Sequence, residues 1–332
     1  MKHANVALFV PNNGCPHACS FCNQRTITGK AVQPTPDDVT KAVGVALKSG
    51  SLHNEDAEIA FFGGSFTAVE HNYMLSLLEA AAPFVRNGTV SGIRISTRPD
   101  AVGEEMLCLL KKYGVTTIEL GAQSMNDAVL SLNGRGHTAK QVENAAKRIR
   151  AYGFSLGLQM MTGLPGDSDA GAWETARRLA ELHPECVRIY PAIVIRGTQL
   201  GKLFLSEAYQ PPSLEETVEL CARLLDFFEG KGIPVIRLGL HASPELERDR
   251  LAGPWHPAFR ELCESRRMLQ KFTDFLTRSN REKGNITVRV SPHDVSAATG
   301  QKKCNLRTLE TLGYLAKIVP DPAVERRSFM IE

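Results

Sequence analysis

The sequence lacks the features that mark membrane and secreted proteins. No apolar run approaches the roughly eighteen residues that a membrane-spanning helix needs. The first apolar stretch, Val6–Val10, is followed at once by Pro11 and Asn12, so it is too short for the apolar core of a secretory signal. We therefore expect a cytoplasmic protein that begins at Met1 and has no membrane contact.

The sequence also has little net charge. The formal charge is only +3, so bulk charge does not indicate a protein that seeks polyanions. Residues 260–332 carry 14 Lys+Arg against 9 Asp+Glu, whereas residues 1–259 carry 25 against 27. The small positive total therefore divides into a slightly acidic major part and a basic C-terminal region, which leaves RNA binding open.

Short β-branched or aromatic segments alternate with longer segments whose apolar residues recur every three or four positions. The first kind predicts strands at 6–10, 58–62, 92–97, 116–120, 155–160, 186–191 and 234–238. The second kind predicts helices at 37–48, 71–85, 104–113, 139–152, 172–182 and 214–230.

Six such βα units in succession predict an α/β fold, a partial (β/α)6-type barrel over residues 1–240, with a doubly wound open sheet as the alternative. The alternation stops after this point. Residues 257–281 predict a long helix, residues 286–290 a strand and residues 300–312 a loop leading into a short helix. Residues 241–332 are therefore expected to form a small α+β accessory region packed on the barrel.

Three of the eight cysteines, Cys15, Cys19 and Cys22, lie in one C-x3-C-x2-C loop directly after the first predicted strand. A barrel would place this loop at its C-terminal face, where barrel enzymes keep their chemistry. A 4Fe-4S cluster normally takes four thiolates, so three ligands would leave one iron open for catalysis. A structural zinc site that includes His17 is the alternative. The other five cysteines are expected to be small buried residues: Cys108, Cys186, Cys221, Cys263 and Cys304.

The cysteine loop, with Phe21 before its last cysteine, resembles that of the radical S-adenosylmethionine (SAM) superfamily. Within that superfamily the chain is most similar to the catalytic subunit of Elongator and its stand-alone bacterial relatives. The motifs that carry this resemblance are Phe62-Gly63-Gly64-Ser65-Phe66, Ser96-Thr97-Arg98-Pro99-Asp100, Glu119-Leu120-Gly121-Ala122-Gln123-Ser124, Arg135-Gly136-His137-Thr138 and the segment from Tyr190-Pro191 through Ile195-Arg196-Gly197-Thr198. Together they cover about residues 5–240, and Gly300-Gln301-Lys302-Lys303 also resembles the bacterial members.

The resemblance implies an enzyme that binds a 4Fe-4S cluster on the three cysteines and SAM on the open iron. One electron, from a flavodoxin- or ferredoxin-type donor, would cleave SAM to methionine and a 5′-deoxyadenosyl radical that removes a hydrogen atom from the substrate. The implied substrate is tRNA or another RNA. The full-length relatives add an acetyltransferase domain, for which the roughly ninety residues after the barrel are too few. Acetyl transfer is therefore not expected of these residues alone.

The residues expected at the SAM site are Gly63, Gly64, Ser65, Thr97, Arg98, Gln123, Ser124, Arg135 and Gln159. All except Arg135 lie in or just after predicted strands, and glycine lets backbone approach a ligand closely. The resemblance places Gly63 and Gly64 at the methionine end of SAM, and Gln123 and Arg135 in contact with it. Related enzymes often place a glutamate where this chain has Ser96.

Several of these residues have a structural alternative. The glycine pair could form a plain turn, and Gln159 could be a buried amide whose hydrogen bonds are satisfied within the protein. The Arg98 guanidinium could bind a ligand carboxylate or form an ion pair with Asp100.

Tyr190 and Arg196 follow the sixth predicted strand and are expected to contact substrate. Lys302, Lys303 and Arg307 form a basic group that would either bind phosphate or face solvent. His137 is expected to be a capping or core residue.

Two alternative functions remain. One is a radical SAM enzyme that acts on a small molecule, similar to the oxygen-independent coproporphyrinogen oxidases. The other is a non-enzymatic RNA-binding protein that carries zinc or an iron–sulfur cluster.

Overall fold

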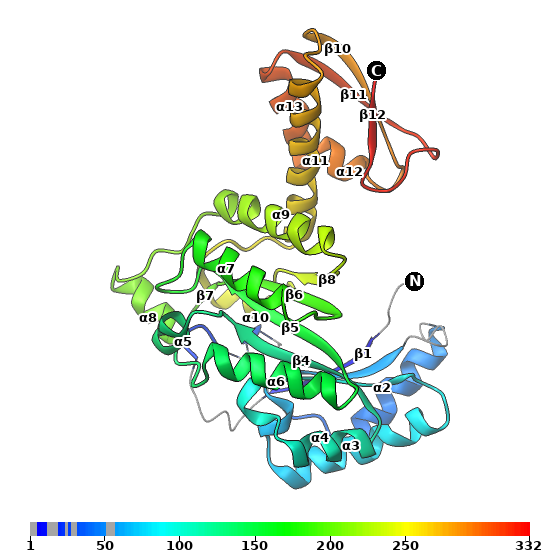
Figure 1. The fold of residues 1–332 in the computed structure, drawn as a ribbon, viewed down its shortest axis with the longest axis vertical. Coiled ribbons are helices and arrows are strands. Elements are labelled where there is room, and N and C mark those ends of the chain that lie inside the picture. The colour runs from blue at the N-terminus through cyan, green and yellow to red at the C-terminus, as the bar shows by residue number, and fades with distance from the viewer. Residues whose placement is uncertain (1–4, 12–18, 24–25, 28–31, 51–56) are drawn as a thin grey trace. The chain divides into compact units, whose positions relative to one another are not determined.

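A computed structural model describes residues 5–11, 19–23, 26–27, 32–50 and 57–332. Its centre is a seven-stranded sheet in the order β1-β2-β3-β4-β5-β6-β8, in which every neighbouring pair is parallel (Figure 1). The strands are β1 (Asn5–Val10), β2 (Glu58–Gly63), β3 (Gly92–Thr97), β4 (Val115–Gln123), β5 (Ser155–Thr162), β6 (Cys186–Pro191) and β8 (Val235–Leu238). All seven predicted strands are present, and the predicted partial barrel is confirmed.

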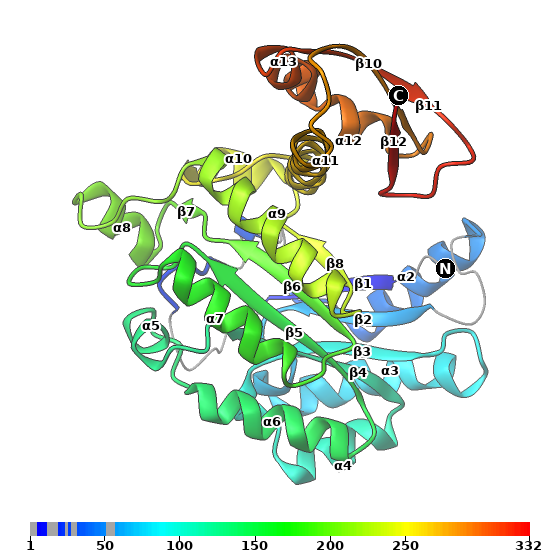
Figure 2. The same cartoon turned by 45° about the horizontal axis from the view of Figure 1, so that its top comes forward.

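Six longer helices follow these strands, as the apolar spacing predicts. They are α2 (Pro36–Lys48), α3 (His71–Arg86), α4 (Glu104–Lys112), α6 (Ala139–Ala151), α7 (Asp169–Ala180) and α9 (Leu214–Gly230). Thr35 and Thr138 each open a helix through a capping box, which satisfies backbone N–H groups that a helix start would otherwise leave unpaired. Both views show α3, α4 and α6 along one face of the sheet (Figures 1 and 2).

Shorter elements were not expected from the sequence. They are the helices α5 (Asp127–Leu132), α8 (Gln199–Leu205) and α10 (Pro244–Asp249), the 3-10 turns η1 (Phe66–Ala68) and η2 (Pro99–Ala101), and the antiparallel pair β7 (Val194–Ile195) and β9 (Arg250–Ala252). Helices of fewer than two turns show too little apolar periodicity to be recognised.

The chain divides into two compact units. The first comprises residues 1–212 and 228–255, and the second comprises residues 213–227 and 256–332. The expected boundary after residue 240 stays a prediction about domains. Within the described ranges, no helix is long and apolar enough to cross a membrane.

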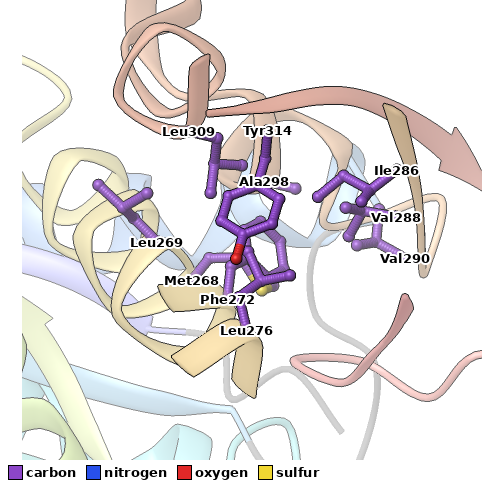
Figure 3. Close-up of a cluster of buried hydrophobic side chains, with 10 residues drawn as sticks. All are labelled: Met268, Leu269, Phe272, Leu276, Ile286, Val288, Val290, Ala298, Leu309 and Tyr314. Carbon is purple, nitrogen blue, oxygen red and sulfur yellow. The ribbon is translucent and has the colours of Figure 1, made fainter. Parts of the chain in front are cut away.

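The second unit contains the predicted long helix, α11 (Phe259–Arg278), and a three-stranded sheet. The predicted strand β10 (Gly284–Val290) pairs with two strands that were not expected, β11 (Tyr314–Pro320) and β12 (Phe329–Ile331). Short helices, α12 (Val295–Thr299), η3 (Gln301–Lys303) and α13 (Cys304–Thr311), complete it. Its core is built around Phe272, which packs edge-on against Phe329 with ring centroids 5.0 Å apart; Figure 3 shows the buried cluster.

The cysteines outside the loop were expected to be buried, and this holds for three of the five. Cys186, Cys221 and Cys263 are buried, but Cys108 on α4 and Cys304 on α13 are exposed. The expectation was wrong for these two because each occupies a helix position that faces solvent rather than the core.

Candidate active site

A cavity of about 1490 Å³ runs along the inner face of the seven-stranded sheet. Its lining reaches from the amino ends of the strands, at Asn5 and Ser155, to the carboxyl ends, at Gly63 and Pro191. Most of the predicted site residues line it: Cys19, Cys22, Gly63, Gly64, Ser65, Thr97, Arg98, Gln123, Arg135, Gln159 and Tyr190. The structure therefore brings motifs from five strands and two loops to one cavity.

Two of the three predicted cluster ligands face this cavity. The backbone N–H of Cys22 donates to the carbonyl oxygen of Cys19 at 3.1 Å, so a tight turn places both residues on one side of the loop. Ser20 fixes this turn, because its hydroxyl donates to the Asn133 side chain at 2.6 Å and its N–H to the Asn133 carbonyl at 3.1 Å. Cys15 lies outside the described residues, among which no three metal-ligating side chains cluster.

Arg135 connects the cysteine loop to the sheet. Its Nη1 donates to Cys19 Sγ at 3.2 Å and its Nη2 to the Gly121 carbonyl at 2.6 Å. Arg98 donates in turn to the Arg135 carbonyl at 2.7 Å. The guanidinium of Arg135 thus ties the Cys19 sulfur to the sheet at the Gly121 carbonyl.

Gln123 lies beside Arg135 in an unusual backbone conformation. The register of β4 shifts between Gly121 and Gln123, and Gln123 has a φ of +66°. Such an irregularity re-aims a side chain next to an active site. The Gln123 Oε1 and the Arg135 Nε are both buried without a hydrogen-bond partner in the protein. A Cβ on Gly121 would lie 3.0 Å from Gln123 Nε2, so this glycine keeps the space open.

Two protein-family models match the chain. The model of the radical SAM superfamily covers residues 9–179, more than half of the chain, and that of the radical SAM C-terminal domain covers residues 184–271. The chain belongs to the radical SAM superfamily. It is thus an enzyme of this superfamily, as its sequence motifs predict.

This radical SAM enzyme is also similar in sequence to individual proteins. It is 29% identical over 256 residues to MJ0486 of Methanocaldococcus jannaschii, with 73% of this chain and 77% of that protein covered. It is 25% identical over 256 residues to the tRNA uridine(34) acetyltransferase of the same organism, covering 65% of this chain and 47% of that protein. The chain therefore spans about half the length of that acetyltransferase.

Among solved structures, the radical SAM chain superimposes on archaeal Elp3 of Methanocaldococcus infernus, lacking its N-terminal residues, with a TM-score of 0.61. The identity is 19%, and the match covers 85% of this chain and 65% of that chain. The two share a fold. The chain is also 30% identical over 194 residues to Elongator complex protein 3 of Homo sapiens, covering 52% of this chain and 36% of that protein, which confirms the predicted resemblance to the Elongator catalytic subunit.

The ion pair expected as the structural alternative for Arg98 is present in this radical SAM protein, and a contact of Arg98 with SAM stays a prediction. Arg98 Nε donates to Asp100 Oδ1 at 2.9 Å and Arg98 Nη2 to Asp100 Oδ2 at 3.1 Å, so the two form a bidentate ion pair at the edge of the cavity. Burial alone would raise the pKa of Asp100, but the hydrogen bonds and charge of Arg98 outweigh it and the pKa is lowered. The Thr97 hydroxyl also has a hydrogen-bond partner within the protein, because its Oγ1 lies 2.5 Å from the Oγ1 of Thr67.

Four of the predicted site residues that the structure describes do not line the cavity. The Ser124 hydroxyl is buried behind β4, 3.4 Å from the Thr175 hydroxyl, and does not line the cavity. Arg196 is exposed, and its N–H donates to the Asp249 carbonyl. Lys302 and Lys303 are exposed in the second compact unit, both with positive φ. Their predicted contacts with cofactor or substrate remain predictions.

His137 matches its expected structural role. It is buried, with Nε2 3.3 Å from the Ala122 carbonyl. Burial, together with the charge of Arg135, lowers the pKa of His137 to about 4, so the ring is neutral near pH 7.

A charged network that sequence reasoning missed lies at the base of the cavity. Glu119, fully buried on β4, accepts from Arg188 Nε at 2.5 Å and Nη2 at 2.8 Å, and from Arg94 Nη1 at 2.9 Å. Gln159 Nε2 donates to the same carboxylate at 3.0 Å. Arg94 Nε also donates to Glu58 at 2.6 Å. Each charged group thus finds an opposite charge, as buried ions require.

Glycine makes room for this network. A Cβ on Gly157 would lie 2.7 Å from Glu119 Cγ and 3.2 Å from Cys186 Sγ, which is closer than packed atoms allow. The Glu119 side chain therefore passes over β5 at Gly157 to reach Arg188 on β6. The signal in the sequence was a single charged residue inside each of three apolar strands.

Proposed function

We propose that this radical SAM enzyme binds a 4Fe-4S cluster on Cys15, Cys19 and Cys22, binds SAM beside it, and modifies tRNA. The observation that carries the proposal is the contact between Arg135 and Cys19 at the wall of the large cavity. When bound, the cluster and SAM would supply a 5′-deoxyadenosyl radical for hydrogen abstraction. The protein's own residues would bind, orient and shield these groups.

The donor set fits an iron–sulfur cluster better than a closed zinc site. Cys19 and Cys22 face an open cavity, and Arg135 donates to the Cys19 sulfur at 3.2 Å. An open cavity beside the ligands suits a metal that must also bind a small molecule. A hydrogen bond to a ligating sulfur is one of the features by which proteins raise the potential of such clusters.

The adjoining rim fits a ligand with polar groups at both ends, such as SAM. The buried Gln123 Oε1 can accept from an ammonium or hydroxyl group, and the Arg135 Nε–H can donate to a carboxylate. Gly63, with a φ of +111°, and Gly64 line the same cavity from β2. Gln159, further down β5, is already bonded to Ser96 at 3.2 Å and to Glu119, which fits a structural role best.

The names of relatives support a substrate class. One relative carries the name tRNA uridine(34) acetyltransferase, and the matched part of that protein is about half of it. We infer that the shared radical SAM part acts on a uridine of tRNA, and we make no inference about the group that is added. The cavity of about 1490 Å³ exceeds the usual size of sites for drug-sized ligands, so it can accept SAM together with a nucleotide.

The cofactor part is tested on anaerobically reconstituted full-length protein. Wild-type protein with SAM and dithionite should release 5′-deoxyadenosine and show the absorbance of a 4Fe-4S cluster. Cys19→Ser and Cys22→Ser should lose both, whereas Cys108→Ser, on an exposed helix position, should keep both. Retention of cluster and SAM cleavage in the Cys19 and Cys22 variants would contradict the proposal.

The substrate part is tested by nucleoside mass spectrometry of tRNA from a strain that lacks the gene. A modified uridine should disappear and should return with the wild-type gene but not with the Cys19→Ser gene. An unchanged set of tRNA nucleosides in the deletion strain would remove tRNA as the substrate while leaving the cofactor chemistry intact.

A further inference from the structure

The wall of the cavity formed by β5, β6 and β8 carries a row of nitrogen-rich side chains. In the register of the sheet, Gly121 pairs with Gln159, Gln159 with Arg188, and Arg188 with Arg237. Register partners on parallel strands point to the same face, so these side chains lie next to one another. Gln159, Arg188 and Arg237 all line the cavity, as does His241 just after β8.

Arginines outnumber acidic side chains in the lining of the whole cavity, although Arg94, Arg98 and Arg188 are each paired with a carboxylate. The described residues that line the cavity include five arginines (Arg94, Arg98, Arg135, Arg188 and Arg237) and a single acidic residue, Glu185. Glu185 accepts from the Leu156 N–H at 2.6 Å, at the amino end of the neighbouring strand β5. The positive side chains thus face the cavity, while Glu58 and Glu119 lie behind its surface.

The two arginines of the row are held in place. Arg188 is fixed through Nε and Nη2 by Glu119, and its guanidinium carbon lies 4.7 Å from the centre of the Phe62 ring. Arg237 Nε donates to the Gly239 carbonyl at 2.9 Å. An arginine has five N–H donors, so an arginine that already has protein partners can add or exchange a hydrogen bond when an anion binds.

His241 follows β8 and lines the same cavity as Arg188 and Arg237. Burial, with the charges of Arg237 and Arg188, lowers the pKa of His241. The row is therefore a convergent site made from two strands and the loop that follows β8.

We propose that Arg188, Arg237 and His241 form a binding site for the phosphate group of the substrate nucleotide. Guanidinium groups bind phosphate oxygens through paired charge-assisted hydrogen bonds, and a neutral imidazole can donate one more. The site lies at the β6 and β8 end of the strand order, whereas the cysteine loop follows β1 at the other end. A nucleotide anchored here would reach across the cavity toward the rim beside Cys19.

The inference rests on the proposed function, because it takes a nucleotide as substrate. Its test compares uridine 5′-monophosphate with uridine in equilibrium binding to the full-length, cluster-loaded protein. The monophosphate should bind about tenfold tighter or more, the usual effect of one charge-assisted hydrogen-bonded contact. Arg237→Gln should bring the ratio close to one, and His241→Gln should reduce it. Arg177→Gln, on the exposed face of α7, should leave it unchanged.

Arg237 is chosen because Arg188→Gln would remove two of the four hydrogen bonds that the buried Glu119 carboxylate accepts, and so would destabilise the fold. Equal affinity for the two ligands, including no measurable binding of either, would overturn the inference. So would a phosphate preference that Arg237→Gln leaves intact. If the phosphate preference depends on Arg237 but tRNA nucleosides are unchanged in the deletion strain, the phosphate site stands and the proposed tRNA function fails.

Discussion

Replacement of Glu119 by glutamine should strongly destabilise the first compact unit. Glu119 is fully buried and accepts four hydrogen bonds, three from Arg94 and Arg188 and one from Gln159. Glutamine has nearly the same shape, so it leaves no cavity. It removes the negative charge and turns one acceptor into an NH2 group that points at other donors.

The size of the effect follows from the arrangement of charges. Removing one partner from a buried ion pair typically costs about 3–5 kcal/mol, because the other charge stays buried without compensation. Here Arg94 keeps Glu58 as a second partner at 2.6 Å, so the loss is concentrated on Arg188. A value near the lower end, about 3 kcal/mol, is therefore expected. That is a large part of the roughly 5–15 kcal/mol by which folded domains are stable.

The assay is urea unfolding followed by circular dichroism, with Glu174→Gln as the matched control. Glu174 also pairs with an arginine, Arg177, but both side chains are about half exposed, so the control should lose at most about 1 kcal/mol. For a slope of about 3 kcal/mol per molar urea, the midpoint of Glu119→Gln should fall by about 1 M. A midpoint no lower than that of the control would refute the role given to the network.

Three further outcomes are expected. Gly157→Ala should destabilise by about 1–3 kcal/mol in the same urea assay, because its Cβ would overlap the fixed side chain of Glu119. Burial alone would raise the pKa of Glu58, but the charge of Arg94 and the hydroxyls of two threonines outweigh burial, so the pKa of Glu58 is lowered. The protein should therefore lose stability as the pH falls below the usual pKa of a glutamate. Glu58→Gln should flatten that part of the curve of stability against pH. Arg135→Gln should keep the iron content but lower the midpoint potential of the cluster, because a hydrogen-bond donor to Cys19 is lost. The measurement is a redox titration monitored by electron paramagnetic resonance. An unchanged midpoint potential would argue against this contact.

The strands of the barrel could be predicted because each is a short, nearly continuous apolar run. For example, β3 is buried from end to end and β5 is buried except at Ser155 and Gln159, and turn residues flank both strands. Their motifs could be assigned to one site because parallel strands bring their carboxyl ends to one edge of a sheet. The strands β11 and β12 were missed, since their burial alternates weakly and several of their side chains are exposed.

The partners within the site could not be predicted from the sequence. Glu119 meets Arg188 on β6 and Arg94 on β3, and which residues lie opposite one another depends on the register of three strand pairs. Likewise, the bulge that gives Gln123 a positive φ leaves no mark in the sequence around it. For Arg98, sequence reasoning left two roles open; the structure shows the ion pair with Asp100, and the contact with SAM stays a prediction.

The buried network also bears on ligand binding. A lone arginine at a cavity wall loses side-chain entropy when it binds an anion, whereas Arg188 is already fixed by Glu119 in the folded protein. The Arg188 side chain is already ordered when the protein folds, so its guanidinium meets a ligand in one fixed orientation. The carboxylate that holds it lowers the net charge of the pair, so the added attraction for phosphate should come chiefly from Arg237, its register partner. Arg188 then acts mainly by geometry and Arg237 by charge, so a lysine should replace the latter far better than the former.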